Sequence, residues 1–340
     1  MLHMCKGDLG VKNSSGTMSR RPSRRALVRL LVAVVLPLTL VFTGVSAGTA
    51  SADPYSRFHE DWVAAPGGVG QIKVRIWRAN NGSNKAVYLL DGLRATDNVS
   101  GWEHETNAAW LSDHGVNVIM PVGGQSSFYA DWYAPSNFNA QPYTYKWESF
   151  LTRNLPDHLA AVYGISRGSN AVVGLSMGGN AALILAAHHR DQFTFAGSMS
   201  GYLNLSAPGM REAIRLAMLD AGGYNSDAMW GPPWDPAWLR HDPFVAAPML
   251  RGLPMWISAS TGLPGQHDRP DSAIGVFNTA NAMGLESIAR VQNRAFQIRL
   301  ATLGIDTAHF SFPIAGTHSW GYWQDELWAM LPMMKNSIGA

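Results

Sequence analysis

The feature that most constrains the fold is the pentapeptide Gly174-Leu175-Ser176-Met177-Gly178, a G-x-S-x-G sequence between an apolar strand-like run and an apolar helix-like run. Glycines two residues either side of a serine let a strand and a helix approach closely around a sharp turn, from which the hydroxyl projects above a sheet. The start of the following helix also favours negative charge. Because a bare G-x-S-x-G is common in glycine-rich chains, the flanking strand and helix carry the prediction that Ser176 is a nucleophile.

Apolar runs and longer helical segments alternate along the chain. The expected strands lie at 71–78, 86–90, 116–120, 171–175, 193–199 and 254–260. The first alternates polar and apolar residues, whereas the fully apolar runs are typical of strands covered on both faces of a parallel sheet. Helices are expected over 147–163 and 210–221, and the proline-rich segment 230–248 as an ordered excursion over the sheet edge. We therefore predict one α/β-hydrolase domain over residues 53–340, with a doubly wound, mostly parallel sheet and helices on both faces.

Composition excludes several classes of protein. Hydrophobic residues make up 46% of the 340 residues and charged ones only 15%, which argues against a disordered, self-repelling chain. The formal charge of +2 comes from the first 52 residues; the remainder has 19 basic and 23 acidic residues, so no overall basic footprint for nucleic acid exists. The single cysteine, Cys5, excludes an intrachain disulfide and a cysteine metal cluster.

Residues 1–52 have the pattern of an export leader. Four arginines lie between positions 20 and 25, the sixteen residues 30–45 are uncharged, and Ala50-Ser51-Ala52 is an A-x-A cleavage signature. The alternative is a membrane anchor, but sixteen residues interrupted by Pro37 fall short of the about 20 that span a bilayer. We expect cleavage near Ala52 and a secreted or cell-envelope-associated protein; the arginine pair resembles a twin-arginine signal, and the export route stays open.

A serine nucleophile needs a general base, and the chain order narrows the choice among ten histidines that follow the leader. In this fold the order is serine, then acid, then a histidine near the carboxyl end. Four histidines come late enough, namely His241, His267, His309 and His318. His318 precedes the last helical segment directly, which is the expected place for the base.

The residues alone leave the acid open. The usual position follows the strand at 254–260, which favours Asp268 or Asp271. Glu286 and Asp306 are further candidates. An oxyanion site also needs preorganised N–H donors, for which the backbone of Met177 and of Leu93, in the loop after strand 86–90, are the best candidates. That loop can equally be a simple turn.

Several stretches resemble the antigen 85 family of secreted mycolyltransferases. They are YLLDGLRATD, IMPVGGQSSFYADWY, TYKWESFL, GLSMGG, DAGGY, MWGP, DPAW and FSFPIAGTHSW, spread over about residues 70–335. The resemblance implies an α/β-hydrolase that uses no cofactor and no metal. It also implies trehalose mycolates as substrates, with glycolipid or cell-wall arabinan as acceptor and peripheral contact with the cell envelope.

The resemblance assigns roles to individual residues. The family's acid is a glutamate thirty-two residues before its catalytic histidine, which corresponds to Glu286 and favours it over Asp268. The oxyanion donors of the family match Leu93 and Met177. Its sugar-contacting residues match three positions here, namely Asp91, Arg94 and Trp320. Two cysteines of mycobacterial members are absent from 135–142, and 261–273 matches poorly, which bears on acyl-chain fit and acceptor preference.

Three functions are consistent with these residues. The first is a serine acyltransferase that forms an acyl-enzyme on Ser176 and passes the mycolyl group to a sugar hydroxyl; the resemblance also allows diacylglycerol acyltransferase activity. The second is a secreted carboxylesterase, in which water attacks the same intermediate. The third is a non-catalytic wall-binding relative, which the presence of serine, glutamate and histidine disfavours. The triad alone does not separate the first two, and only the proposed acceptor residues favour transfer.

Overall fold

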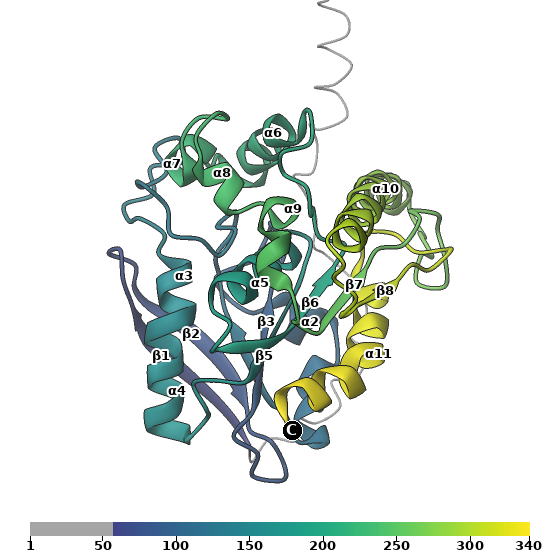
Figure 1. Ribbon diagram of the computed structural model, residues 1–340. Coiled ribbons are helices and arrows are strands. Elements are labelled where there is room, and N and C mark those ends of the chain that lie inside the picture. Colours follow the sequence, from purple (N-terminus) through teal and green to yellow (C-terminus); the bar gives the residue numbers. More distant parts are fainter. Residues whose placement is uncertain (1–56) are drawn as a thin grey trace, which may run out of the picture. The chain divides into compact units, whose positions relative to one another are not determined.

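An eight-stranded sheet runs through residues 57–340, the part of the chain that the computed structural model describes (Figure 1). The strands lie in the order β1-β2-β4-β3-β5-β6-β7-β8. Their bounds are β1 Phe58–Ala65, β2 Gly70–Trp77, β3 Ala86–Leu90, β4 Asn117–Pro121, β5 Asn170–Leu175, β6 Phe193–Met199, β7 Met255–Ser258 and β8 Ala308–Ser311. The expected leader and its cleavage site at Ala52 lie outside the described residues.

From β3 onward, one or more helices follow each strand. They are α2 Gly101–Glu105, the 3-10 helix η1 Ala108–His114, α3 Trp147–Ser149, the π-helical turn η2 Phe150–Asn154, α4 Leu155–Tyr163, α5 Met177–His188, α6 Met210–Gly222, α7 Ser226–Trp230, α8 Ala237–Arg240, α9 Pro243–Ala246, the 3-10 helix η3 Ala247–Leu250, α10 Ala273–Thr302 and α11 Trp320–Ile338. Among residues 57–340, no helix has the length and apolar character needed to cross a membrane.

Strand direction confirms the predicted fold class. β1 pairs with β2 and β2 with β4 in antiparallel fashion, and every other pairing is parallel. The carboxyl ends of β3, β5, β6, β7 and β8 therefore lie at one edge of the sheet, where ligand sites of such sheets form. All six expected strands are present within a few residues, but β1 and β8 were not predicted.

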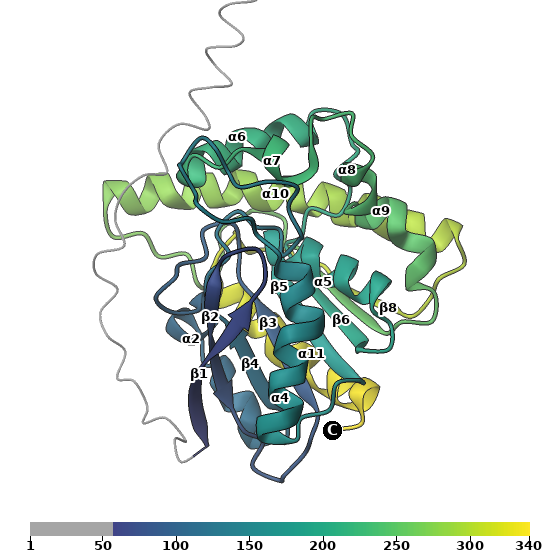
Figure 2. The same cartoon turned by 90° about the vertical axis from the view of Figure 1, so that its left-hand side faces the viewer.

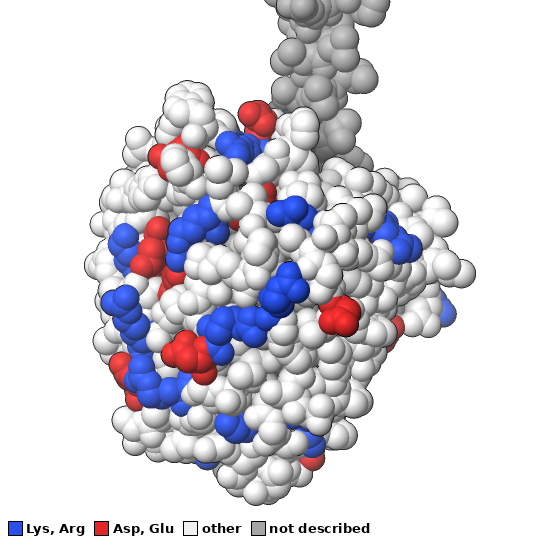
Figure 3. Space-filling model, in the orientation of Figure 1, with Lys and Arg blue, Asp and Glu red and all other residues white. Residues whose placement is uncertain are grey.

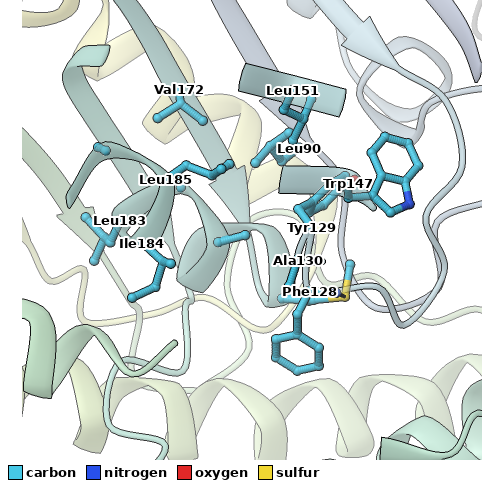
Figure 4. Packing of buried hydrophobic residues seen from close by; sticks show 14 of the residues in the cluster. Leu90, Phe128, Tyr129, Ala130, Trp147, Leu151, Val172, Leu183, Ile184 and Leu185 are labelled. Atoms are coloured by element: carbon cyan, nitrogen blue, oxygen red, sulfur yellow. Dashed lines mark hydrogen bonds between the residues drawn. The ribbon is translucent and has the colours of Figure 1, made fainter. Parts of the chain in front are cut away.

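Helices cover both faces of the sheet, as expected for a doubly wound fold. Figure 2 shows α4 and α5 in front of the sheet and α11 behind it. Alternate residues of β3 divide accordingly: Tyr88 and Leu90 belong to the core under α4 and α5, and Val87 and Leu89 to the core under α11. Figure 4 shows Leu90 and Val172 of the first core among side chains of α5 and the segments beside it.

The proline-rich segment 230–248 is ordered, as predicted, but its position differs from the prediction. It forms α8 and α9, and α9 with η3 packs against α5 in the helical layer rather than over the edge of the sheet. Buried Trp230 and Trp238 stack edge to face at 5.1 Å, which anchors the segment. The packing of these aromatic rings explains why a proline-rich stretch is held in one place.

Candidate active site

The turn between β5 and α5 has the geometry that the G-x-S-x-G sequence predicts. Ser176 has φ 52° and ψ −119°, a backbone conformation that costs energy in a residue other than glycine. A Cβ atom on Gly174 would overlap the carbonyl oxygen of Gly178, and a Cβ on Gly178 would lie 2.5 Å from the carbonyl oxygen of Asp91. Both glycines are therefore required by the close approach of backbone segments around the serine.

The turn lies where the sheet strands end. The amide of Ser176 donates to the carbonyl of Met199, the last residue of β6, at 2.8 Å. The amide of Ser200, directly after β6, donates to Ser258 at the end of β7 at 2.7 Å. Ser176 and Ser200 therefore lie on adjacent loops at the same edge of the sheet.

A buried carboxylate and a histidine meet beside these loops. His318 Nδ1 lies 2.9 Å from Glu286 Oε2, and Glu286 is only 1% exposed. The other carboxylate oxygen, Oε1, accepts the hydroxyl of Ser200 at 2.9 Å and the amide of Ser260 at 2.7 Å. Because a carboxylate can only accept hydrogen bonds, Nδ1 of His318 carries the proton and donates it to Glu286. This leaves His318 Nε2 as the nitrogen that can accept a proton from another group.

Tryptophan and serine side chains extend this arrangement. The indole Nε1 of Trp323 donates to the Ser200 hydroxyl at 2.9 Å, so that hydroxyl must use its own proton on Glu286. The ring of Trp323 also packs edge-on against His318 at 5.0 Å. Ser200 has φ 52°, a strained backbone at the end of a strand. No sequence motif points to Ser200, Ser260 or Trp323; their only signal is position, just after the end of a strand for the two serines and in the first turn of α11 for Trp323.

The other acid candidates have different partners or none near the base. Asp268 accepts the hydroxyl of Thr317 at 2.6 Å on one oxygen, and on the other the hydroxyl of Tyr322 at 2.6 Å and the amide of Gly265 at 2.9 Å. Both of its oxygens are thus occupied, by Thr317 before His318, by Tyr322 of α11 and by the nearby amide of Gly265. Asp271 and Asp306 are exposed. Of the four carboxylates, the structure brings only Glu286 to His318.

The other histidine candidates lie in different surroundings. His267 pairs with exposed Asp325 at 2.8 Å, and His309 stacks on Trp256 at 4.0 Å. His241 stacks on Trp230 at 4.4 Å, and burial lowers its pKa to about 4. None of the three contacts a buried carboxylate in the way that His318 does.

The loop after β3 lies against the serine turn. A Cβ on Gly92 would be 2.9 Å from the Leu175 side chain and 3.6 Å from the Cβ of Ser176. The carbonyl of Leu93 accepts the amide of Ser126 at 2.9 Å, which holds the loop. Neither the amide of Leu93 nor that of Met177 donates to an acceptor among the described residues. The two predicted oxyanion donors are therefore unpaired N–H groups on segments adjacent to Ser176.

Two of the three predicted sugar-contacting residues lie beside the same residue, Gly101, where a Cβ would overlap the ring of Trp320 and would be 3.1 Å from Asp91 Oδ1. Asp91 is 2% exposed, and its carboxylate oxygens lie beside the start of α2, where burial raises its pKa to about 7. Arg94 instead forms a salt bridge with Asp220 of α6. Trp320 is partly exposed and packs edge-on against Trp102 at 5.5 Å. A ligand can reach Arg94 and Trp320 in this structure, but the carboxylate of Asp91 is covered.

The hydroxyl of Ser176 makes no hydrogen bond to a described residue. Catalytic hydrogen bonds are often long in unliganded enzymes and shorten when the substrate binds. Within residues 57–340, no three histidine, cysteine or acidic side chains are grouped so that they could hold a metal ion. The site consists of a strained serine, two free amides, and a histidine oriented by a buried carboxylate.

Comparison with known proteins gives relatives across nearly the whole described region. The family model described as "Putative esterase" matches residues 70–334. The chain is 46% identical over 304 residues to the diacylglycerol acyltransferase/mycolyltransferase Ag85B of Mycobacterium avium, covering 87% of this chain and 89% of that one. It is 41% identical over 331 residues to Ag85C of the same organism, covering 96% and 91%.

Solved structures support the same relationship. The crystal structure of Mycobacterium tuberculosis MPT51 aligns with a TM-score of 0.71 at 33% identity, over 83% of this chain and 98% of that one. The serine hydrolase FphF of Staphylococcus aureus aligns with a TM-score of 0.59 at 15% identity, over 83% and 98% of the two chains, and this likeness concerns the fold alone.

Proposed function

Because the chain belongs to the antigen 85 family of diacylglycerol acyltransferases/mycolyltransferases, we propose that it is a serine acyltransferase. The acyl group is a mycolyl chain, the donor is trehalose monomycolate, and the acceptor is a second trehalose monomycolate or cell-wall arabinogalactan. The observation that carries the proposal is the buried Glu286–His318 pair beside the strained turn of Ser176. A fold alone does not assign an activity, so the proposal depends on these side chains together with the close relatives.

In the first half of the proposed reaction, the hydroxyl of Ser176 attacks the ester carbonyl of the donor. His318 Nε2 takes the serine proton, and Glu286 stabilises the imidazolium that forms. The carbonyl oxygen becomes negatively charged, and we assign the free amides of Leu93 and Met177 to bind it. His318 then gives the proton to the leaving sugar oxygen, which leaves the mycolyl group on the serine.

The second half runs the same steps with an acceptor hydroxyl. His318 removes the proton from that hydroxyl as it attacks the acyl-serine, and returns it to Ser176 when the product leaves. Water competes for the same intermediate at roughly 55 M, so transfer needs an acceptor that is held in position, where effective molarities of about 10⁵ M are attainable. Arg94 and Trp320 are the partly exposed groups proposed to hold the sugar. Asp91 can join them only if the start of α2 moves away from its carboxylate.

Export belongs to the same proposal. We assign residues 1–52 to a leader that is removed near Ala52, and residues 53–340 to the catalytic domain. The mature protein is then a secreted or envelope-associated enzyme, in the same compartment as the proposed cell-wall acceptor. N-terminal sequencing of the protein recovered from the culture medium tests the assignment, since an uncleaved N-terminus would contradict it.

Incubation of the purified protein with trehalose monomycolate tests the activity. Transfer yields trehalose and dimycolate in equal amounts, whereas hydrolysis yields trehalose and free mycolic acid. The Ser176→Ala variant is the matched control, because the substituted side chain lies on a turn and not in the core. Free acid as the main product would replace the proposal with a carboxylesterase, and no product from the wild-type protein would refute both.

A further inference from the structure

The longest helix of the described region, α10, has an exposed apolar stripe. Ile274, Phe277, Ile288, Val291 and Ile298 are exposed and recur at separations that place them along one side of the helix. The intervening positions on that line are Asn281, Gly284 and Ala295, which are small or uncharged. We call these five side chains the α10 face. An exposed apolar surface of this kind marks an interaction site.

Two loops near His318, the proposed general base, extend the α10 face. Ile314 is 85% exposed and Leu263 is 58% exposed. The loops are tied to the helix through Thr261, whose hydroxyl donates to the carbonyl of Ile314 at 2.9 Å and whose carbonyl accepts the hydroxyl of Ser287 at 3.1 Å. The apolar surface therefore continues from α10 towards the loop that carries His318.

The charges of α10 indicate whether a second copy of the chain or an anionic surface covers the α10 face. Its only carboxylate, Glu286, is buried, while Arg290, Arg294 and Arg299 form no salt bridge to a described residue. Where α10 is visible in Figure 3, its surface is white and blue. Two copies of this helix side by side would bring arginine against arginine with no exposed carboxylate to compensate. The charges instead complement an anionic surface.

The arginines are held in place by aromatic rings. The guanidinium of Arg294 lies 3.8 Å from the ring centroid of Phe312, and that of Arg290 lies 4.3 Å from the same ring. Arg290 also donates to the carbonyl of Ala259 at 2.6 Å. Positions fixed in this way keep positive charge beside the apolar stripe.

We propose that the α10 face is an interfacial docking surface that lies on a lipid layer with anionic headgroups. A helix with apolar side chains on one side and arginines beside them is the usual form of a segment that lies in a membrane interface. Apolar side chains enter the outer part of the layer, and the arginines remain at the headgroups. The inference rests on the proposed function in one respect: a lipid acyl donor would reside in such a layer, next to the His318 loop.

Vesicle binding tests the inference separately from catalysis, because it is measured with the Ser176→Ala variant. The probes are vesicles of phosphatidylcholine alone and vesicles of phosphatidylcholine and phosphatidylglycerol in equal parts, assayed by co-sedimentation. We expect binding to both, tighter to the anionic vesicles by about fivefold for each arginine that contributes. If the protein binds neither kind of vesicle, the inference is wrong, even if the enzyme is active.

Substitutions on the exposed face locate the contact. Val291→Ser, which changes a side chain 69% exposed, should weaken binding to both vesicles roughly fivefold, and the double variant Val291→Ser/Ile298→Ser more strongly. The matched control is Val162→Ser on α4, where the side chain is 56% exposed, and it should leave binding unchanged. An equal loss in the control would show that binding is not specific to α10 and would refute the inference.

The charge component has its own pair of variants. Arg294→Gln should weaken binding to the anionic vesicles about fivefold and leave binding to the neutral vesicles unchanged. Arg153→Gln, at another exposed arginine, is the control. Sedimentation equilibrium of the same proteins tests the alternative that a second copy of the chain covers the α10 face. A dimer that Val291→Ser abolishes would support that alternative, and the lipid proposal would be wrong. In proteins that keep Ser176, hydrolysis of a soluble short-chain ester should stay at the wild-type rate after Val291→Ser and after Arg294→Gln.

Discussion

Replacement of Glu286 by glutamine should remove nearly all activity while leaving the fold intact, for a reason that the hydrogen bonds specify. Glu286 Oε1 accepts two donors, the hydroxyl of Ser200 and the amide of Ser260. In Glu286→Gln the amide oxygen is the only acceptor left, so it must take this position. The side-chain NH₂ group then faces His318 Nδ1, where the carboxylate Oε2 lies 2.9 Å away in the wild type.

The consequence is a change of tautomer. A donor opposite Nδ1 requires that Nδ1 be unprotonated, which puts the proton of neutral His318 on Nε2. That nitrogen can then no longer accept the proton of Ser176. The loss of the carboxylate also removes the charge that stabilises the imidazolium. A carboxylate-to-amide change of this kind in a serine triad costs about 10⁴-fold in rate, or about 5 kcal/mol of transition-state stabilisation.

The measurement compares Glu286→Gln with Asp268→Asn. Asp268 is the control because it stands at a position where this fold usually has its acid. Hydrolysis of a short-chain ester gives kcat, and thermal melting shows whether each variant folds. Asp268→Asn disturbs the hydrogen bonds of Thr317 and Tyr322, so we expect a loss of stability of about 1–3 kcal/mol with activity within tenfold of wild type. A Glu286→Gln variant that keeps a tenth of wild-type activity, or an inactive but folded Asp268→Asn, would refute the reasoning.

The remaining predictions concern the nucleophile, the acceptor and pH. Ser176→Ala should lower turnover by about 10⁶-fold with an unchanged melting curve; half-retained activity would contradict the mechanism. Arg94→Ala should shift product from dimycolate to free mycolic acid more than it slows short-ester hydrolysis, and an equal shift in Asp220→Asn would show that their salt bridge only shapes the loop. Burial raises the pKa of Asp91 to about 7, whereas the unfolded chain releases this proton at about pH 3.9. The folded chain therefore holds the proton more tightly, and the free energy of unfolding falls as the pH rises from about 3.9 to about 7. Asp91→Asn should flatten that decline in urea unfolding, and an unchanged pH dependence would show that Asp91 ionises normally.

The sequence predicted those parts of the fold that depend on local pattern. The apolar runs became β3 to β7 because continuous apolar stretches must be covered on both faces. The serine turn was predictable since Gly174 and Gly178 are required by contacts within the same pentapeptide and with the neighbouring strand. β1 was not predicted: as an edge strand it pairs on one side only, and only one of its eight side chains is buried, so no apolar pattern indicates it.

The acid could not be chosen from the residues because its position depends on long-range packing. The usual position in the fold pointed to Asp268 or Asp271; the oxygens of Asp268 are taken by Thr317 and Tyr322, and Asp271 is exposed. Glu286 reaches His318 only because α10 returns over the ends of β6 and β7 and meets Ser200 and Ser260. The resemblance to the antigen 85 family supplied what local pattern did not. The role of Glu286 in catalysis remains a prediction until the variants are measured.

The same helix connects the proposed site to the proposed surface. On its inner side Glu286 is fixed by two hydrogen bonds besides the one to His318. The amide of His318 donates to the carbonyl of Ala282 at 3.2 Å, and a Cβ on Gly262 would overlap the carbonyl of Met283 or the hydroxyl of Ser287. Acid and base are therefore both held against one short stretch of α10, whereas Val291 and Ile298 on the outer side touch none of these bonds. Because the helix is anchored by buried Ala289, Phe296 and Leu300, a change on the outer side should alter contact with lipid while leaving the alignment of acid and base unchanged.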